Sequence, residues 1–185
     1  MIQGIIPFSH ELVKRAAKEG DIVVDATCGN GNDTLFLSYL VESSGQVYAF
    51  DIQQEAIDRT KQLLDEHKRN NVTLIKDTHA NVDEYIKDKE VAAAIFNLGY
   101  LPKGDKKIVT KPESTLSAVK KLLKMLKKNG LIVLVVYSGH PGGQEEKNAV
   151  LEFVTALNQQ QYTVLQYQFI NFINNPPFVI AIEKK

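Results

Sequence analysis

Short apolar strands alternate with amphipathic helical stretches along most of this chain. β-Branched runs such as 22–25 and 46–51 are separated by segments whose apolar residues recur with helical spacing. This pattern is typical of a parallel sheet covered by helices on both faces. Beyond residue 157 the alternation stops, and two apolar runs, 162–170 and 178–183, are joined only by residues 171–177. Because that connection is too short for a parallel crossover, we expect the last two strands to pair antiparallel.

The sequence therefore predicts one doubly wound α/β domain over residues 1–185, with a mostly parallel sheet and a C-terminal antiparallel β-hairpin. Ser9 is the expected N-cap of the first helix, and Gly130 is expected to end the helix before the fifth strand. The expected helices are 9–18, 33–41, 55–68, 82–86, 114–128 and 144–157; the expected strands are 22–25, 46–51, 72–76, 91–96, 131–137, 162–170 and 178–183.

Composition excludes several classes of protein. Lysine and arginine together number 22, as do aspartate and glutamate, so no bulk positive charge is available to coat nucleic acid. Cys28 is the single cysteine, which excludes an internal disulfide and CxxC metal or redox patterns, and we expect no metal. No apolar run approaches the roughly 20 residues that cross a bilayer. The N-terminal apolar run is interrupted by Pro7 and lacks a basic leader, so we expect a cytoplasmic protein.

A glycine-containing loop follows the first strand. Gly29 and Gly31 allow a tight turn and a close approach of a ligand to the backbone. The dinucleotide fingerprint G-x-G-x-x-G would need glycine at position 34, where the chain has Thr34, and no Gly-Lys-Ser/Thr of a phosphate-binding loop follows. The loop therefore favours a nucleotide-like ligand that has no pyrophosphate.

Acidic residues beside this loop indicate which ligand that is. Asp25 would repel a pyrophosphate but can accept hydrogen bonds from an ammonium, directly or through water, although it could also simply cap a turn. Asp51 ends the second strand, where ribose hydroxyls are bound, and residues 77–79 end the third, where an adenine edge would be read. An amino acid, a ribose and an adenine in that order describe S-adenosylmethionine. The expected cofactor-binding residues are Asp25, Cys28, Gly29, Asn30, Gly31, Asn32, Asp33, Asp51, Gln53, Thr78 and His79.

Four motifs resemble one known family. They are 25–37 in the first loop, 97–106 after the fourth strand, 137–146 after the fifth and 175–178 near the end. The sequence is similar to the bacterial group formerly classed as rRNA methylases and now understood as tRNA 5-aminomethyl-2-thiouridine methyltransferases (MnmM), which have the class I methyltransferase fold. The resemblance implies methyl transfer from S-adenosylmethionine to the aminomethyl nitrogen of the wobble uridine in tRNA. It also implies a homodimer.

The motif after the fourth strand carries the expected chemistry. Amino-group methyltransferases that act on bases have Asp/Asn-Pro-Pro-Tyr at this place, and here Asn97 and Tyr100 flank Leu98 and Gly99. Asn97 is expected to accept a hydrogen bond from the target nitrogen, and Tyr100 to stack on the base. The amine must also lose a proton before it attacks. Asp105, His140 and Tyr100 are candidates for that base, and the sequence does not decide between them.

Basic residues follow the same motif. We expect Lys103, Lys106 and Lys107 to contact phosphates of the tRNA anticodon stem-loop, whereas the lysines of 120–128 form the solvated face of a helix. Three alternatives remain open: an rRNA or small-amine methyltransferase, a non-catalytic S-adenosylmethionine- or RNA-binding module, and a nicotinamide-dependent oxidoreductase. Thr34 and the terminal hairpin count against the oxidoreductase.

Overall fold

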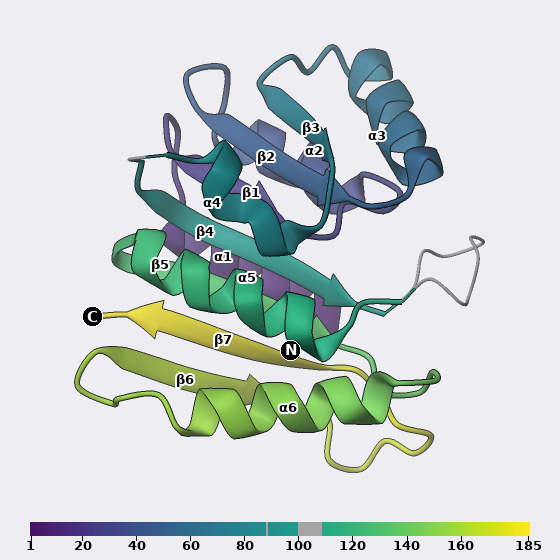
Figure 1. Cartoon of the computed structure of the whole chain (residues 1–185), viewed down its shortest axis with the longest axis vertical. Coiled ribbons are helices and arrows are strands. Elements are labelled where there is room, and N and C mark those ends of the chain that lie inside the picture. The colour runs from purple at the N-terminus through teal and green to yellow at the C-terminus, as the bar shows by residue number, and fades with distance from the viewer. Residues whose placement is uncertain (88, 100–108) are drawn as a thin grey trace.

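A computed structural model describes residues 1–87, 89–99 and 109–185. Within these residues, seven strands form one sheet in the order β3-β2-β1-β4-β5-β7-β6 (Figure 1). Strands β1 to β5 run parallel to one another, and β7 is antiparallel to both β5 and β6. The predicted doubly wound sheet with a terminal antiparallel hairpin is therefore confirmed. The strands are β1 (Ile22–Asp25), β2 (Gln46–Asp51), β3 (Val72–Lys76), β4 (Val91–Leu98), β5 (Leu126–Val136), β6 (Tyr162–Tyr167) and β7 (Phe178–Lys184).

Helices cover both faces of the sheet, and each face has its own apolar core. On one face, α1 and α2 pack against the side chains of Val23, Val47 and Val133. On the other, α4, α5 and α6 pack against Val24, Phe96 and neighbouring residues. Because the central strands are covered on both sides, they consist of continuous apolar runs. The helices are α1 (Ile5–Ala16), α2 (Asn32–Leu40), α3 (Gln54–Glu66), the 3₁₀ turn η1 (His79–Asn81), α4 (Val82–Tyr85), α5 (Pro112–Met125) and α6 (Gly143–Thr155).

The expected start of the first helix is wrong. Helix α1 begins at Ile5, and Ser9 lies buried inside it, where its hydroxyl donates to the carbonyl of Ile6 at 2.8 Å instead of capping the helix. Pro7 does not prevent this start, because the N–H groups of the first helical turn have no partner inside the helix. The earlier start adds Ile5, Ile6 and Phe8 to the apolar contacts of α1 with the sheet.

The expected boundary between the fifth helix and strand is also wrong. Helix α5 ends at Met125, and β5 begins at Leu126, so Gly130 lies in the strand instead of ending the helix. Leu126 is buried and pairs with Val91 of β4, after which the register shifts until Leu131 pairs with Ala93. Burial of Leu126 thus overrides the helical periodicity of the lysine-rich segment around it.

Two further boundaries differ in ways that affect the ends of the sheet. Strand β4 continues to Leu98 instead of ending at 96, so Asn97 lies in the strand and pairs with Val135. Strand β6 ends at Tyr167 instead of 170. The other observed ends lie within about two residues of the expected ones, the usual uncertainty of a helix or strand terminus.

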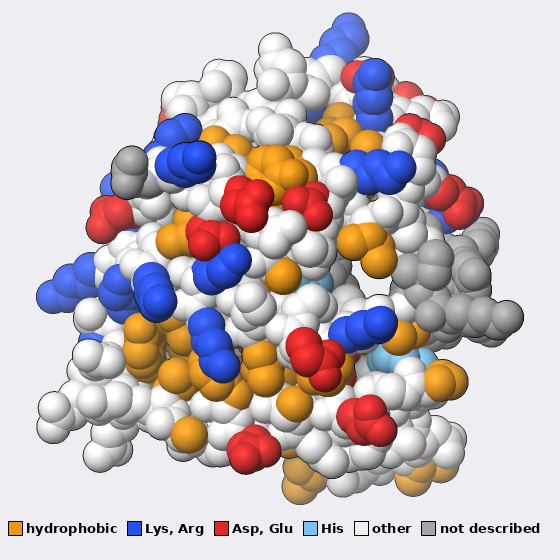
Figure 2. All heavy atoms as spheres, in the orientation of Figure 1, with side chains coloured by type: hydrophobic (Ala, Val, Ile, Leu, Met, Phe, Trp, Pro, Cys, Tyr) orange, Lys and Arg blue, Asp and Glu red, His pale blue; other side chains and the backbone are white. Residues whose placement is uncertain are grey.

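The surface carries mixed charge. Figure 2 shows lysine and arginine side chains interspersed with aspartate and glutamate on the face that α5 and α6 cover, as expected for a chain of zero formal net charge. In the described part of the chain, no helix is long and apolar enough to cross a membrane.

Candidate active site

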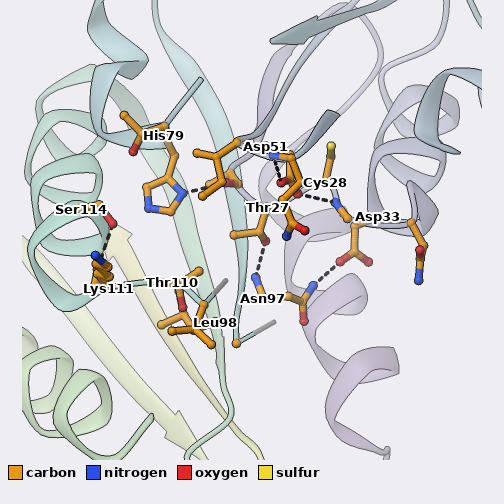
Figure 3. A pocket seen from close by; sticks show the side chains of 18 of the residues that line it. Thr27, Cys28, Asp33, Asp51, His79, Asn97, Leu98, Thr110, Lys111 and Ser114 are labelled. Atoms are coloured by element: carbon orange, nitrogen blue, oxygen red, sulfur yellow. Dashed lines mark hydrogen bonds between the residues drawn. The ribbon is translucent and has the colours of Figure 1, made fainter. Parts of the chain in front are cut away.

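A cavity of about 760 Å³ opens at the carboxyl ends of the central strands. Its walls come from the β1–α2 loop, the ends of β2, β3 and β4, and the segment that leads into α5 (Figure 3). Strands β1 and β4 are neighbours at the point where the strand order reverses, which is where open α/β sheets bind ligands. Nine predicted cofactor residues line the cavity: Cys28, Gly29, Asn30, Asn32, Asp33, Asp51, Gln53, Thr78 and His79.

The β1–α2 loop is a tight turn built on two glycines with positive φ. The Gly31 N–H donates to the carbonyl of Cys28 at 2.7 Å, and Gly31 occupies the N-cap position of α2 with a φ of 84°. A Cβ at Gly31 would lie 3.0 Å from the backbone of Thr60 on α3, so the loop and α3 pack too closely for a side chain there. Gly31 therefore shapes the loop from behind and does not line the cavity.

Asp25 lies behind the same loop. Its side chain is fully buried, is absent from the cavity lining, and accepts hydrogen bonds from the Thr27 N–H (3.1 Å) and the Thr34 hydroxyl (2.6 Å). Burial, reinforced by the negative charge of Asp33, raises the pKa of Asp25 to about 7. Asp25 therefore does not line the cavity, and its predicted hydrogen bond to an ammonium group, direct or through water, stays a prediction. Asp25 holds the loop against the start of α2.

Asp51 lies in the cavity wall, at the end of β2. Its two oxygens accept from the N–H groups of Gly29 (3.1 Å) and Gln53 (2.9 Å). A carboxylate has about four acceptor positions, so each oxygen keeps one for a further donor. Partial burial raises the pKa of Asp51, while the hydrogen bonds from backbone N–H groups oppose that shift. The free positions fit the two hydroxyls of a ribose.

The end of β3 contributes polar groups to the same wall. His79 is buried, and its Nδ1 lies 2.8 Å from the carbonyl oxygen of Ala26. Because a carbonyl only accepts, Nδ1 carries the hydrogen and Nε2 is an acceptor; burial lowers the pKa of His79 and favours this neutral form. The thiol of Cys28 is also buried, and burial raises its pKa, so little of the reactive thiolate is present at neutral pH.

Asn97 of β4 is held through two groups, its main-chain N–H and its side-chain amide. Its main-chain N–H donates to the hydroxyl of Thr27 at 2.7 Å, and its side-chain amide donates to a carboxylate oxygen of Asp33 (Figure 3). Both partners come from the β1–α2 segment, 70 and 64 residues earlier in the chain. Sequence analysis missed this role of Thr27, and no local pattern indicates it, because the contact exists only when β1 and β4 are adjacent.

The remaining predicted site residues are only partly placed. Tyr100, Asp105, Lys103, Lys106 and Lys107 lie outside the described residues. His140 is in the turn before α6 and is not a cavity-lining residue, but its ring carbon Cε1 lies 3.8 Å from where a Cβ of Gly99 would be. Asp77, expected near the adenine edge, also lines the cavity. Lining residues that sequence analysis did not assign to the site are Ala26, Thr27, Ile52, Leu98, Gly99, Val109, Thr110, Lys111, Ser114 and Tyr137.

The segment that leads into α5 is fixed by a buried carboxylate. Glu146 of α6 accepts from the hydroxyls of Thr110 (2.6 Å) and Thr115 (2.7 Å). Thr110 also donates its N–H to the carbonyl of Gly99, which ties this segment to the end of β4. Among the described residues, no cluster of three or more His, Cys, Asp or Glu side chains could hold a metal ion.

Comparison with known proteins agrees with this geometry. Residues 47–183 match the family described as Putative rRNA methylase. The chloroplastic tRNA (mnm(5)s(2)U34)-methyltransferase of Arabidopsis thaliana is 39% identical over 96% of this chain and 68% of its own length. A rRNA-methylase crystal structure from Clostridium thermocellum (48% identity) and a methyltransferase from Streptococcus mutans in complex with SAH (44%) cover 100% of both chains, with TM-scores of 0.98 and 0.93. The resemblance inferred from the four motifs is thus confirmed, and the chain belongs to the Putative rRNA methylase family of methyltransferases.

Proposed function

We propose that this chain is an S-adenosylmethionine-dependent N-methyltransferase that acts on tRNA. Its substrate is the aminomethyl group of 5-aminomethyl-2-thiouridine at the wobble position, and its product is 5-methylaminomethyl-2-thiouridine. The observation that carries this proposal is the 39% identity with the Arabidopsis tRNA (mnm(5)s(2)U34)-methyltransferase, which extends over 96% of this chain. The whole chain acts as one domain.

The cavity has donors and acceptors that fit S-adenosylmethionine. The two free acceptor positions on Asp51 suit ribose hydroxyls, Asp77 and Thr78 lie where β3 ends and suit an adenine edge, and the β1–α2 loop is left for the methionine part. Asp33 is the carboxylate of that loop that lines the cavity. The cofactor supplies an electrophilic methyl group on a positively charged sulfur.

The residues of the protein act mainly by aligning the amine nitrogen with the methyl group. Asn97 lines the same cavity as Asp51 and accepts a hydrogen bond from the amine, which points the nitrogen lone pair at the methyl group. Holding the reacting atoms at roughly 3 Å removes most of the entropic cost of their encounter. The amine must first lose the proton of its ammonium form. Tyr100, Asp105 and His140 remain the candidates for the group that takes it.

Labelled cofactor and tRNA from a strain that lacks this gene test the proposal. Nucleoside mass spectrometry should find the methyl label on 5-methylaminomethyl-2-thiouridine, and tRNA from the complemented strain should accept almost none. Label in rRNA alone, or in a small amine, would replace the substrate and keep the enzyme class. Cofactor binding without transfer to any of these acceptors would indicate a non-catalytic binding module.

The finer assignments follow from the same proposal. Lys103, Lys106 and Lys107 bind phosphates of the anticodon stem-loop, and their position right after the strand-four motif supports this. The protein acts as a homodimer, which the family resemblance supports, and it works in the cytoplasm. Light scattering at micromolar concentration should give twice the mass of 20.7 kDa, and a monomer at that concentration would contradict the dimer.

A further inference from the structure

Asp33 lies between the strand-four amide and a histidine from the first helix. One oxygen of its carboxylate is 2.6 Å from Nε2 of His10, and the other accepts a hydrogen bond from Nδ2 of Asn97. The three side chains come from α1, α2 and β4. Asp33 is in the first turn of α2, and only 12% of its side chain is exposed, so its carboxylate is held mainly by these partners.

The chemistry of Asp33 decides which way the Asn97 amide faces. An ionised carboxylate has no hydrogen to donate, so only the NH₂ of the amide can face it. The carbonyl oxygen of the same amide must then face away from Asp33. The main chain of Asn97 cannot rotate to compensate, because it is paired with Val135 and its N–H donates to Thr27. Asn97 lines the cavity, so its amide oxygen is the atom left for a donor in the cavity (Figure 3).

His10 is itself held in place. Its ring stacks on Phe36 of α2, with the ring centres 4.0 Å apart and an angle of 5° between their planes. Because Asp33 only accepts, Nε2 of His10 carries the hydrogen that the two share. Helix α1 is packed on the sheet through Val13 and its neighbours, so this contact ties the carboxylate to the core. His10 does not line the cavity.

We propose that His10 is a positioning residue for methyl transfer, acting through Asp33 on Asn97. It keeps the Asp33 carboxylate directed at the amide, and this orients the Asn97 oxygen to accept an N–H from the amine that is methylated. The arrangement selects methyl-accepting groups that carry an N–H, because the Asn97 oxygen can accept a hydrogen bond from it. It disfavours groups that present only hydrogen-bond acceptor atoms to the Asn97 oxygen. The inference rests on the proposed function for its substrate, but the orientation of the amide is a property of the protein alone.

Three variants separate positioning from a general effect on stability. In His10→Ala the donor to Asp33 is lost, and kcat should fall about tenfold or more while the dissociation constant for S-adenosylhomocysteine stays within about twofold. His10→Gln keeps a side-chain N–H donor and should recover much of the lost kcat. The matched control is His67→Ala at the end of α3, where the histidine bonds the hydroxyl of Tyr39 on the surface; it should leave kcat unchanged.

A second readout needs no substrate. In the cofactor-free protein, the two side-chain NH₂ resonances of Asn97 should be slow to exchange and well separated by NMR, since one N–H is bonded to Asp33. In His10→Ala the exchange should become faster and the separation of the two resonances smaller, and His10→Gln should restore both. The change in Tm should be small for either variant. Asp33→Asn should also make the exchange faster and the separation smaller, because an amide at position 33 can face Asn97 with either its donor or its acceptor.

The outcomes keep this inference apart from the proposed function. A wild-type protein that fails to methylate tRNA refutes the proposed substrate, and the Asn97 resonances still decide the positioning role. If the wild type is active and His10→Ala matches His67→Ala in kcat and in the Asn97 resonances, the positioning role is refuted. If His10→Ala instead weakens cofactor binding about as much as it lowers kcat, His10 only stabilises the loop, and the inference also fails.

Discussion

The two sides of the cavity differ in what holds their polar side chains. On the side formed by β1, β2 and β3, Asp51 and His79 are held by backbone groups of the β1–α2 loop and of adjacent turns. On the β4 side, Asn97 is held by two side chains, Thr27 and Asp33, from a segment more than 60 residues earlier in the chain. Both arrangements require the strands to assemble, because the contacts of Asp51 with Gly29 and of His79 with Ala26 span 22 and 53 residues. They differ in that Asp51 and His79 depend on backbone groups, whereas Asn97 depends on partner side chains.

Because of this difference, we expect cofactor binding and methyl transfer to respond differently to substitutions. Backbone groups cannot be lost by substitution, so the cofactor side should keep its shape when one side chain changes and should lose only that side chain's own contacts. The amide of Asn97 depends on a chain of side chains, so it can lose its orientation through changes that never touch the cavity. Variants on the two sides should therefore give opposite patterns of affinity and turnover.

The largest effect is expected at Asn97. In Asn97→Ala the acceptor that aligns the amine is removed, and turnover should fall about 100-fold or more, since small errors of alignment are costly in the transition state. Affinity for S-adenosylhomocysteine should change by no more than about twofold. Single-turnover kinetics and calorimetry measure the two quantities. Retained turnover with weaker cofactor binding would show that Asn97 acts in cofactor binding, and the proposed difference between the two sides of the cavity would be refuted.

Asp51 should show the opposite pattern. Asp51→Ala removes a charged acceptor, and a loss equivalent to one such hydrogen bond, about 1.5–3 kcal/mol, should lower affinity for S-adenosylhomocysteine about 10- to 100-fold. Turnover at saturating cofactor should change much less. Asp58→Ala, an exposed carboxylate on α3, is the matched control and should leave affinity unchanged. Unchanged affinity in Asp51→Ala would mean that the ribose is bound elsewhere, and tight binding of NAD would refute the proposed cofactor.

The lysines that follow the strand-four motif should affect only RNA binding. Replacing Lys103, Lys106 and Lys107 by alanine should weaken tRNA binding and reduce its salt dependence by about one unit of slope for each lost phosphate contact. The matched control replaces Lys120, Lys124 and Lys128, which are exposed, and changes the net charge equally. Filter binding at several salt concentrations measures both. If the control has the larger effect, the RNA binds at Lys120, Lys124 and Lys128 instead.

The smallest effect is expected at Asp25, and it depends on pH. Burial raises the pKa of Asp25 to about 7 in the folded protein from 3.8, so the folded state keeps a proton that the unfolded state releases. The stabilisation from that proton is fully present below about pH 4 and is lost as pH rises through 7. Asp25→Asn cannot ionise, so Tm of the wild type relative to this variant should fall by several degrees between pH 5 and 8. Parallel Tm profiles would show that Asp25 is ionised throughout.

Much of the fold could be predicted because its signals are local. Apolar β-branched runs between turn residues predict β1 to β5, and the short connection after 162–170 predicts the antiparallel hairpin, which is confirmed. The direction of the chain in a parallel sheet also places Asp51 and Asn97 at one edge, since all carboxyl ends meet there. The expected boundaries at Ser9 and Gly130 are wrong because tertiary burial outweighs a weak local preference.

The sequence by itself determined the family, the sheet and the edge at which the polar residues gather, because strand direction and hydrophobic pattern are properties of consecutive residues. Only the tertiary structure decided what each side chain at that edge does. It turned Asp25 away from the cavity and into the core, and it joined His10, Asp33 and Asn97 from three separate elements. The physical reason is that a hydrogen bond depends on direction as well as proximity. The direction of each of these side chains is set by the helices and strands packed around it, which lie far away in the sequence.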